Sequence, residues 1–370
     1  MNKYTVIGSG IAARSFAKWV NAPLKVFTKD PFPYSRMAIL DVLKKEVKEE
    51  NIALKFPKNA EIHTKKEASF IDADERTIQF KDGTKESYEK LVIATGATPN
   101  KIDFKDASIP ILTIRDLKDI KTIDQLLGQG KDKVCILGGG FVSMETANAL
   151  YKRGVKITML VSSSRVLSRS LNSEASKMVE QVLRQKGIKV LKNSKVVDIK
   201  DNTLYLEDGN TLKADFVVIG KGVKRKVIKV KWKGTVYEDY NADEYFKTPF
   251  EDIYLIGDAL KTRDLITQEE RLNAIWPIAE REGRHLAMLL NQRLQNPYKG
   301  DVPYNMLSVF DMCIFSIGNT KKGKEKINLK TDTSLFMVTE ENRKIYGLIS
   351  INHPLPFARI VKRFMQNGYF

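Results

Sequence analysis

Two glycine-rich turns, far apart in the sequence, constrain the fold of this chain more than any other feature. The first, Gly8-Ser9-Gly10, follows the apolar run that ends at Ile7, and the second, Gly138-Gly139-Gly140, follows the run that ends at Leu137. Each turn precedes an amphipathic stretch that contains alanine, as expected for a strand, a tight turn and a helix. In that arrangement the first glycine makes the turn, and the second lets backbone N–H groups approach a pyrophosphate at the helix N-terminus. One such turn is a weak signal, but two in this context predict that the chain binds two nucleotides.

The size and composition of the chain fit a protein of two or three domains. It has 370 residues, of which 42% are hydrophobic and 29% are charged. No apolar run approaches the roughly 20 residues that a membrane-spanning helix needs. The first predicted strand begins at Tyr4, which leaves no room for a signal peptide, so we expect a cytoplasmic protein.

The formal net charge of +17 raises the question of an anionic partner. Such a balance can favour nucleic acid, an anionic membrane surface, anionic cofactors or an acidic protein. The densest basic run is 221–233, which contains no acid, and we interpret it as a solvated strand and loop face. No nucleic-acid recognition motif accompanies the charge, so an acidic redox protein is the stronger functional alternative.

The cysteine pattern excludes several kinds of redox and metal site. There are two cysteines, Cys135 and Cys313, and both lie in apolar runs where a structural thiol is expected. No Cys-x-x-Cys motif and no metal-ligand spacing occurs, and His63, His285 and His353 form no cluster. We therefore expect no disulfide-reductase chemistry, no iron–sulfur cluster, no structural zinc site and no other metal.

The hydrophobic pattern predicts alternating strands and helices, which is typical of the α/β class with parallel sheets. The second glycine-rich unit has the character of a duplicate inserted into the first, because a strand that ends at Gly257-Asp258 resembles one more strand of the first unit. The predicted fold is two Rossmann-like dinucleotide-binding domains, one inserted in the other, followed by a small C-terminal α+β domain. The main elements expected are strands 4–7, 24–27, 90–96, 133–137, 156–161, 216–219 and 253–258, and helices 12–20, 39–50, 114–127, 141–153, 173–186 and 268–295.

In this order the motifs resemble the FAD-dependent pyridine nucleotide-disulfide oxidoreductase superfamily. The resemblance is to its non-disulfide branch, which includes rubredoxin and ferredoxin reductases and related NAD(P)H:acceptor oxidoreductases. It implies an FAD domain made of residues 1–112 and 248–296, an NAD(P)H domain of residues 113–247 and a C-terminal interface domain of residues 297–370. The motifs that carry it are Gly8-Ser9-Gly10, Pro33-Tyr34-Ser35-Arg36, Ala94-Thr95-Gly96, Gly138 through Glu145, Gly220-Lys221-Gly222-Val223, Gly257-Asp258 and Ile275-Trp276-Pro277.

The resemblance also implies which residues serve the two cofactors. Glu145 corresponds to an acid near the contact between nicotinamide and flavin, and it is the candidate catalytic residue. The implied FAD-binding residues are Gly8, Ser9, Gly10, Ala13, Thr28, Lys29, Arg36, Ala68, Ala94, Thr95, Gly96, Gly257, Asp258, Trp276 and Pro277. The implied NAD(P)H-binding residues are Gly138, Gly139, Gly140, Phe141, Val142, Glu145, Ser162, Arg165, Gly220 and Gly222.

Both nucleotide units depart from the usual pattern at the end of their second strand. About 20 residues past a dinucleotide turn, an acid normally accepts hydrogen bonds from the adenosine ribose. The first unit has Thr28 and Lys29 there, and the second has Val161 followed by Ser162-Ser163-Ser164-Arg165. Three hydroxyls and an arginine suit a 2′-phosphate, but a plain serine-rich turn explains them equally well, so NADH and NADPH both remain open. Ala13 and Ser143 replace the third glycine of each turn, and both are small enough for close packing.

We interpret as structural several other segments that carry function in members of the family that the chain resembles. Residues 34–45, where disulfide-reducing relatives carry cysteines, contain none. We favour a solvated helix face for Lys44 and Lys45. The alternative is that one of these lysines lies near the flavin. His353-Pro354 resembles the C-terminal pair of disulfide reductases, but it has no cysteine pair to serve. The aromatic C-terminus, with Phe364 and Tyr369-Phe370, is interpreted as an amphipathic helix, with a dimer contact or a partner dock as the alternative.

These observations lead to a functional hypothesis with two alternatives. We expect a flavoprotein oxidoreductase that passes a hydride from NAD(P)H to FAD and then electrons to an acidic electron-carrier protein such as rubredoxin or ferredoxin. An NAD(P)H oxidase that reduces O2 or a quinone is the alternative within the class. An FAD-binding subunit or redox sensor of a larger complex is the alternative outside it, and a homodimer stays open.

Overall fold

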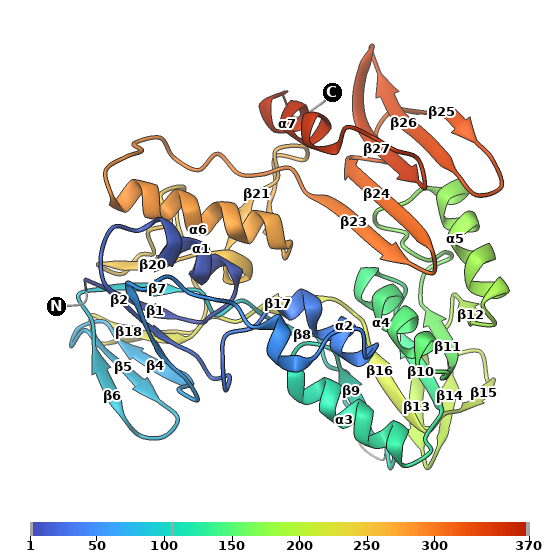
Figure 1. The fold of residues 1–370 in the computed structure, drawn as a ribbon, viewed down its shortest axis with the longest axis horizontal. Helices are drawn as coiled ribbons and strands as arrows, with labels where there is room; N and C mark the ends of the chain where they lie inside the picture. Colours follow the sequence, from blue (N-terminus) through green and yellow to red (C-terminus); the bar gives the residue numbers. More distant parts are fainter. Residues whose placement is uncertain (1–2, 105–106, 368–370) are drawn as a thin grey trace. The chain divides into compact units, whose positions relative to one another are not determined.

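The computed structural model describes residues 3–104 and 107–367. The chain divides into two compact units (Figure 1), each of which gathers separate stretches of sequence. Unit 1 contains residues 1–36, 49–98 and 224–301, and unit 2 contains residues 37–48, 99–223 and 302–370. Two of the places where the chain passes between the units lie in short strands, β8 (Ala97–Pro99) and β17 (Val223–Arg225). The predicted α/β fold, with parallel sheets and a C-terminal domain, is confirmed.

Unit 1 is built on a five-stranded parallel sheet. Its strand order is β20-β7-β1-β2-β3, so the chain begins in the middle of the sheet. Because β1, β7 and β20 are parallel neighbours, the loops that follow them meet at one carboxyl edge. The strands are β1 (Tyr4–Ile7), β2 (Leu24–Phe27), β3 (Ala60–His63), β7 (Lys90–Ile93) and β20 (Ile253–Leu255).

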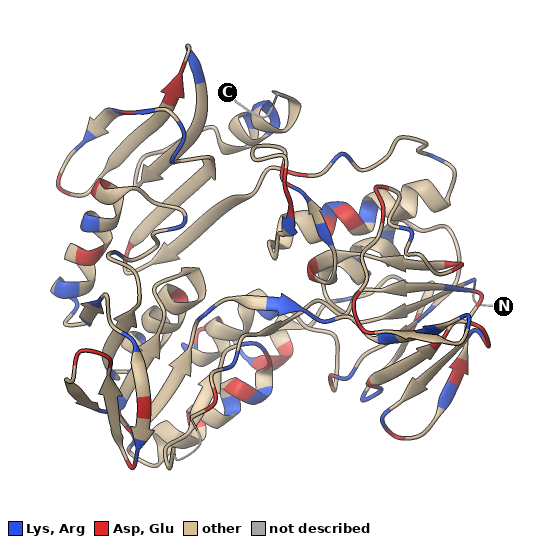
Figure 2. Ribbon diagram, turned by 180° about the vertical axis from the view of Figure 1, so that it is seen from behind, with Lys and Arg blue, Asp and Glu red and all other residues tan. Residues whose placement is uncertain are grey.

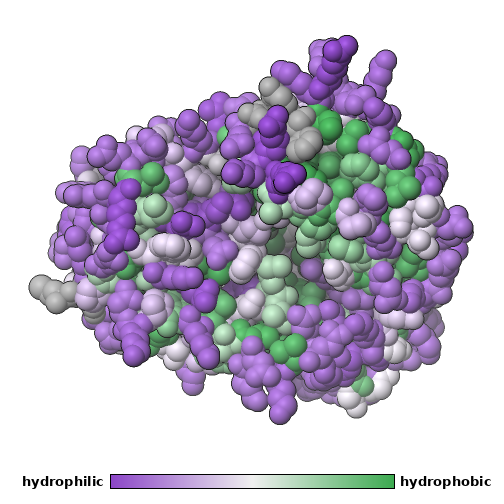
Figure 3. All heavy atoms as spheres, turned by 45° about the horizontal axis from the view of Figure 1, so that its top comes forward, coloured by the Kyte–Doolittle hydropathy of each residue, from purple (hydrophilic) through white to green (hydrophobic). Residues whose placement is uncertain are grey.

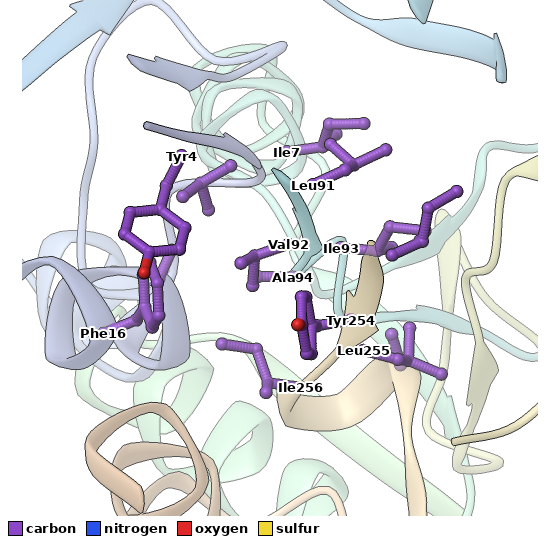
Figure 4. Close-up of a cluster of buried hydrophobic side chains, with 14 of the residues drawn as sticks. Tyr4, Ile7, Phe16, Leu91, Val92, Ile93, Ala94, Tyr254, Leu255 and Ile256 are labelled. Carbon is purple, nitrogen blue, oxygen red and sulfur yellow. The ribbon is translucent and has the colours of Figure 1, made fainter. Parts of the chain in front are cut away.

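Two helices from opposite ends of unit 1 pack together beside this sheet. They are α1 (Ile11–Trp19) and α6 (Trp276–Leu290), and their backbones approach so closely that a Cβ on Gly283 would lie 2.2 Å from the Ala12 carbonyl oxygen. Figure 4 shows the apolar cluster around this sheet, in which Tyr4, Phe16 and Val92 lie on one side of the strands and Leu91, Ile93 and Leu255 point to the other. The Tyr4 and Phe16 rings meet edge to face at 5.6 Å. Continuous burial along β1, β7 and β20 is what parallel strands with both faces covered require.

A second sheet completes unit 1 and explains the basic run. Its strand order is β19-β18-β4-β5-β6, with β6 (Lys85–Ser87), β5 (Thr77–Phe80), β4 (Ala68–Asp72), β18 (Lys229–Trp232) and β19 (Thr235–Tyr237). Acids pair with several basic residues of the run, so the solvated strand and loop face that we predicted also carries compensating negative charge. Lys226 Nζ lies 3.1 Å from Glu67, Lys231 Nζ lies 2.9 Å from Asp72, and Arg225 and Lys229 pair with Asp239 and Glu238. Figure 2 shows basic and acidic residues interspersed along the ribbon.

Unit 2 repeats the parallel design of unit 1. Its five-stranded sheet has the order β12-β11-β10-β16-β9, again with the glycine-turn strand, β10, inside the sheet. The strands are β9 (Ile111–Thr113), β10 (Lys133–Leu137), β11 (Lys156–Val161), β12 (Lys189–Lys192) and β16 (Phe216–Ile219). The helices are α2 (Ile39–Leu43), α3 (Leu117–Gly128), α4 (Phe141–Lys152) and α5 (Ser173–Gln185), and β13 (Val196–Lys200), β14 (Thr203–Leu206) and β15 (Thr211–Lys213) form a small antiparallel sheet.

The C-terminal part of unit 2 is an antiparallel sheet with one helix, as the predicted α+β tail requires. The strand order is β23-β24-β27-β26-β25, with β23 (Tyr304–Val309), β24 (Met312–Gly318), β25 (Lys324–Lys330), β26 (Leu335–Glu341) and β27 (Lys344–Ile351). Helix α7 (Phe357–Asn367) is amphipathic and buries Ile360 and Phe364, and the Phe357 ring lies 4.5 Å from that of Phe315. The predicted contact at Tyr369-Phe370 lies outside the described residues.

Two predicted helices are wrong in length. The helix expected over 39–50 ends at Leu43, because Lys45 adopts a left-handed backbone with φ +64°, and only a short 3-10 turn, Glu49–Ile52, follows. The helix expected over 268–295 begins only at Trp276, with Pro277 in its first turn, where a missing N–H costs nothing. The residues before it form a hairpin, β21 (Lys261–Arg263) with β22 (Glu270–Leu272).

The surface of the structure carries many hydrophilic side chains, as expected for a chain with this many charged residues. Figure 3 shows hydrophilic side chains over much of one face, with groups of hydrophobic ones between them. In the described part of the chain, no helix is long and apolar enough to cross a membrane.

Candidate functional site

The first glycine-rich turn of unit 1 has a backbone that excludes side chains. Gly8 has φ +105°, and a Cβ there would lie 2.1 Å from the Ala94 carbonyl oxygen at the end of β7. Its N–H donates to the Phe27 carbonyl oxygen at 2.8 Å, which ties the turn to β2. Helix α1 begins directly afterwards with Gly10 as N-cap, and no described side chain caps it. The N–H groups of its first turn are therefore available to an anion such as a pyrophosphate.

A buried polar chain links this turn to the end of β2. Ser9 Oγ donates to Thr28 Oγ1 at 2.8 Å, and the Asp30 backbone N–H donates to the same Thr28 oxygen at 3.2 Å. The Asp30 carboxylate is 8% exposed and binds Arg36 Nη2 at 2.8 Å. The Arg36 guanidinium also stacks over the Tyr34 ring at 5.3 Å. An acid therefore does lie near this strand end, two residues after Thr28, as Asp30.

The ends of β7 and β20 complete the same edge of the sheet. After β7, Thr95 Oγ1 donates to the Lys226 carbonyl oxygen, and Gly96 adopts φ +75°. After β20, Gly257 adopts φ +70°, and a Cβ there would lie 2.9 Å from the Cβ of Ala12 in α1. Asp258 follows in a short 3-10 turn, Gly257–Ala259. These predicted residues therefore gather with Gly8 at one edge, which is the arrangement a dinucleotide along the carboxyl ends needs.

Glu282 supports this edge from α6, and no sequence motif identifies it. This side chain of α6 is 2% exposed, and its Oε2 accepts the Gly257 N–H at 2.7 Å. Burial raises the pKa of the Glu282 carboxyl well above its ordinary value, and the nearby Asp258 charge adds to the shift. An acid in the middle of a helix normally faces solvent, so only the packing of α6 reveals its role.

Four other residues predicted for FAD take different positions. Trp276 is 40% exposed and begins α6 together with Pro277. Ala68 starts β4 in the second sheet of unit 1, and Lys29 is exposed beside the buried Thr28.

The second glycine-rich turn, in unit 2, has the same construction. Gly138 has φ +142°, and a Cβ there would lie 2.4 Å from the Gly220 carbonyl oxygen at the end of β16. A Cβ on Gly139 would lie 2.8 Å from Val161 Cγ1. Helix α4 begins with Gly140 as N-cap, and within residues 3–104 and 107–367 no side chain caps it. Phe141 and the exposed Val142 form its first turn.

The end of β11 is rich in hydroxyls, as predicted. Ser163 Oγ donates to the Arg165 carbonyl oxygen at 2.8 Å, which closes a tight loop after Val161. Ser162 Oγ lies 3.3 Å from Lys221 Nζ, a lysine of the Gly220–Val223 motif that was not among the predicted coenzyme-binding residues. Gly222 follows with φ +80° and is exposed.

Glu145 is a largely buried acid on α4, next to α2. Burial raises the pKa of the Glu145 carboxyl, while the positive charge of Lys44 acts in the opposite direction and Asp41 adds to the rise. Lys44 Nζ is 2.8 Å from Asp41 Oδ1, and Lys45 pairs with Asp124 of α3. An acid with a raised pKa beside a lysine is a candidate for holding or moving a proton.

The cysteines carry no redox pair. Cys135 and Cys313 are both free, one buried in β10 and the other exposed on β24. Burial raises the pKa of the Cys135 thiol, which keeps it unreactive. In the described residues, no cluster of three or more His, Cys, Asp or Glu side chains could hold a metal. The His353 ring stacks on Phe336 at 5.4 Å.

The fold and these edges define a class of protein: an α/β oxidoreductase with two dinucleotide sites and no redox-active disulfide. The family model described as pyridine nucleotide-disulphide oxidoreductase matches residues 2–283. The chain belongs to this family and is an NAD(P)H-dependent flavin oxidoreductase that uses FAD. Its residues fit the two nucleotides, because at Gly8 and Gly138 a Cβ would fill the turn and the helix that follows each turn lacks a side-chain cap.

Individual relatives are similar to this chain over most of its length. It is 28% identical to the NADH-dependent phenylglyoxylate dehydrogenase subunit epsilon of Aromatoleum evansii, over 95% of this chain and 88% of that protein. It is 26% identical to a rubredoxin-NAD(+) reductase of Pseudomonas putida, over 70% of this chain and 72% of the relative. Among solved structures, the covalent putidaredoxin reductase–putidaredoxin complex is similar with a TM-score of 0.85 and 18% identity, covering 99% of this chain and 93% of that one.

Proposed function

We propose that this protein transfers electrons from NAD(P)H to a small electron-carrier protein. The observation that carries the proposal is the pair of matching glycine turns, Gly8 and Gly138, at the carboxyl edges of two parallel sheets in a chain without a cysteine pair. When bound, FAD accepts the hydride of NAD(P)H and releases its electrons to an acceptor. Without a thiol pair, those electrons have no disulfide to pass through. A rubredoxin reductase among the relatives supports a carrier such as rubredoxin or ferredoxin.

The proposed cofactor-binding residues fall into two groups, one in each unit. In unit 1 the proposed FAD site has the Gly8–Gly10 turn for the pyrophosphate, Asp258 for the ribityl hydroxyls, and Asp30 at the adenosine end. In unit 2 the proposed NAD(P)H site has the Gly138–Gly140 turn for the pyrophosphate. Glu145, a partly buried acid with a raised pKa, is the group we propose to lie near the nicotinamide.

Charge supports an acidic carrier, although only part of the densest basic run contributes. The net charge of +17 favours association with acidic proteins. Because Lys226, Lys229 and Lys231 are paired with acids, the attraction has to come from other basic residues. If the carrier is acidic, its rate of reduction falls steeply as salt is added. A rate that does not respond to salt contradicts the acidic carrier but not the reductase.

A subunit of a larger complex is the second candidate. It is favoured by the similarity to a dehydrogenase subunit, which runs along 95% of this chain, C-terminal region included. In that case the chain accepts electrons from NAD(P)H or returns them to NAD(P)+ only together with its partner. We also propose that the protein forms a homodimer and that it lies in the cytoplasm, where NAD(P)H is available. The three-domain division expected from the sequence stays part of the proposal.

An anaerobic titration separates these candidates. The purified chain is mixed with NADH or NADPH while the absorption of oxidised flavin is followed, and rubredoxin, ferredoxin, a quinone and O2 are then offered as acceptors. Rapid bleaching and fast reduction of the carrier support the reductase, whereas fast reduction of O2 supports an oxidase. Bound flavin that neither coenzyme bleaches supports the subunit. A protein without flavin refutes the proposal.

A further inference from the structure

One lysine at the carboxyl edge of the parallel sheet in unit 2 has no acid beside it among the described residues. Lys221 follows β16, and its Nζ lies 3.3 Å from Ser162 Oγ, just after β11. Because β10 lies between these two strands, the Lys221 side chain reaches across the edge where the Gly138 turn begins. Within the described ranges, Lys221 has no carboxylate partner. Burial lowers the pKa of its ammonium group, and the charge of Lys195 adds to the shift.

More positive charge lies at the same strand end. Ser194 N–H donates to the Val161 carbonyl oxygen at 3.1 Å, which brings the next residue, Lys195, to the end of β11. Arg165 follows the serines, and its Nε is buried without a hydrogen-bond partner in the part of the chain that the structure describes. Three hydroxyls, Ser162 to Ser164, lie between these cations.

The acids of this region are held by other groups. Glu180 accepts the Val166 N–H at 3.3 Å and binds Lys192 Nζ at 2.9 Å. Glu207 pairs with Lys195 at 3.3 Å, but both side chains are more than half exposed, so the pair screens the edge weakly. Lys221 and Ser162 therefore present donors without a competing acceptor.

This arrangement matches one part of a nicotinamide coenzyme. When the pyrophosphate lies on the Gly138 turn, the adenosine ribose extends toward the end of the next parallel strand, which here is β11. An acid at that position accepts the ribose 2′-hydroxyl and repels a 2′-phosphate, whereas hydroxyls and cations bind the phosphate. We propose that Ser162 and Lys221, with Arg165 beside them, bind the 2′-phosphate of NADPH and make NADPH the preferred coenzyme. This inference rests on the proposed function, which assigns the second turn to NAD(P)H.

Equilibrium binding tests the inference without turnover. Calorimetric titrations with NADP+ and NAD+, and with the fragments 2′,5′-ADP and 5′-AMP, compare the chain with Lys221→Met and Ser162→Glu. Lys133→Met, an exposed lysine at the opposite end of the same sheet, is the control. We expect NADP+ to bind at least about tenfold more tightly than NAD+, the value of one charge-assisted hydrogen bond. Lys221→Met should remove most of this difference and leave NAD+ unchanged, Ser162→Glu should reverse it, and Lys133→Met should change neither affinity.

Each outcome either supports or overturns the assignment. Equal or tighter binding of NAD+ by the unaltered chain overturns it, as does a Lys221→Met variant that weakens NADP+ and NAD+ to the same extent. Flavin content and bleaching, measured on the same samples, judge the proposed function separately. Bleaching by NADH with no preference for 2′,5′-ADP refutes NADPH and keeps the reductase, whereas tight 2′,5′-ADP binding without bleaching refutes the reductase and keeps the phosphate site. A chain that binds no dinucleotide refutes both.

Discussion

The two glycine-rich turns have nearly the same backbone but different surroundings. Gly8 and Gly138 both have positive φ, and in both a Cβ would overlap the carbonyl oxygen at the end of a neighbouring strand, Ala94 or Gly220. Beyond the turns the two edges differ in charge. The first ends its second strand with the buried acid Asp30, and the second ends it with Ser162 beside Lys221.

This difference separates what the backbone decides from what the side chains decide. Close strand packing forces glycine at both turns, so both edges offer the same place for a pyrophosphate. The residue at the end of the next strand lies beyond this packing and is free to vary, so it is where the two sites acquire different ligands. The following variants test whether the two edges share a place for a pyrophosphate and differ in the ligand bound at the end of the next strand.

The largest effect is expected from filling the two turns. Gly8→Ala and Gly138→Ala each place a Cβ within 2.5 Å of a backbone oxygen at a positive φ, so each should cost about 3 kcal/mol of stability through strain and overpacking. Gly8→Ala should also lose flavin, whereas Gly138→Ala should keep flavin and lose its bleaching by NAD(P)H. Thermal unfolding and the ratio of flavin to protein measure both effects.

Two further glycines make this test sharper. Gly128→Ala, in α3, puts a Cβ into open space in the described structure and should leave stability and flavin unchanged. Gly10→Ala also meets nothing within 4 Å, so it should preserve stability but weaken FAD through the close approach of the phosphate. Loss of flavin in Gly138→Ala would contradict the assignment of the two turns to different nucleotides.

The sequence predicted the two turns well because their geometry is local. A short apolar strand, a glycine and a helix lie within a few residues of one another, so no distant contact is needed to recognise them. The family resemblance implied that Ala94 and Gly257 serve the same cofactor as Gly8, and the parallel sheet does bring these three residues to one edge. The helix predicted over 39–50 failed because its end depends on Lys45 entering a left-handed conformation, which composition does not reveal.

Of the residues that were missed, Glu282 and Lys221 depend on tertiary contacts, whereas Asp30 depends on a local bend of the chain. Asp30 lies two residues beyond the expected position, where its backbone N–H bonds back to Thr28 Oγ1. Glu282 looks like any surface acid on a helix until α6 packs under Gly257. Lys221 is one of many lysines, and only the fold shows which of them face an acid and which do not.

Glu282 offers a second contrast, because no Asp or Glu in the described part of unit 2 is as fully buried. The unfolded Glu282 carboxyl ionises near its ordinary pKa of 4.5, while burial raises the pKa in the folded state. Both states hold the proton below about pH 4.5. Above it only the unfolded state releases the proton, so stability falls as pH rises until the folded pKa is reached, by up to about 1.4 kcal/mol per pH unit.

Glu282→Gln should remove this slope and raise stability at neutral pH, since the amide oxygen still accepts the Gly257 N–H. Denaturant unfolding between pH 4 and 8 measures the effect, and Glu280→Gln, on the same helix, is the matched control. An unchanged slope in Glu282→Gln would show that this carboxyl does not hold a proton in the folded protein.

Asp30 tests whether the acid at the first edge serves FAD. Asp30→Asn keeps the shape but removes the charge that binds Arg36, and a lost charge-assisted hydrogen bond should weaken FAD about tenfold. Asp72→Asn is the control, because Asp72 also pairs with a basic residue in unit 1, Lys231, but in the second sheet. Flavin release during dialysis measures the affinity. If both variants lose flavin equally, Asp30 stabilises the unit and has no particular role at the nucleotide.

The smallest effect is expected where the two turns already agree, at the small residue that follows each of them. Ala13 and Ser143 are both buried, and Ser143 Oγ reaches the Gly220 carbonyl oxygen only at a long 3.4 Å. A hydrogen bond this long contributes little, so Ser143→Ala, which copies the first turn, should change stability by no more than about 0.5 kcal/mol and leave coenzyme affinity intact. Thermal unfolding and NADP+ titration check this. A large loss of affinity would mean that the Ser143 hydroxyl contacts the coenzyme, and the two turns would then differ at the phosphate as well as at the ribose.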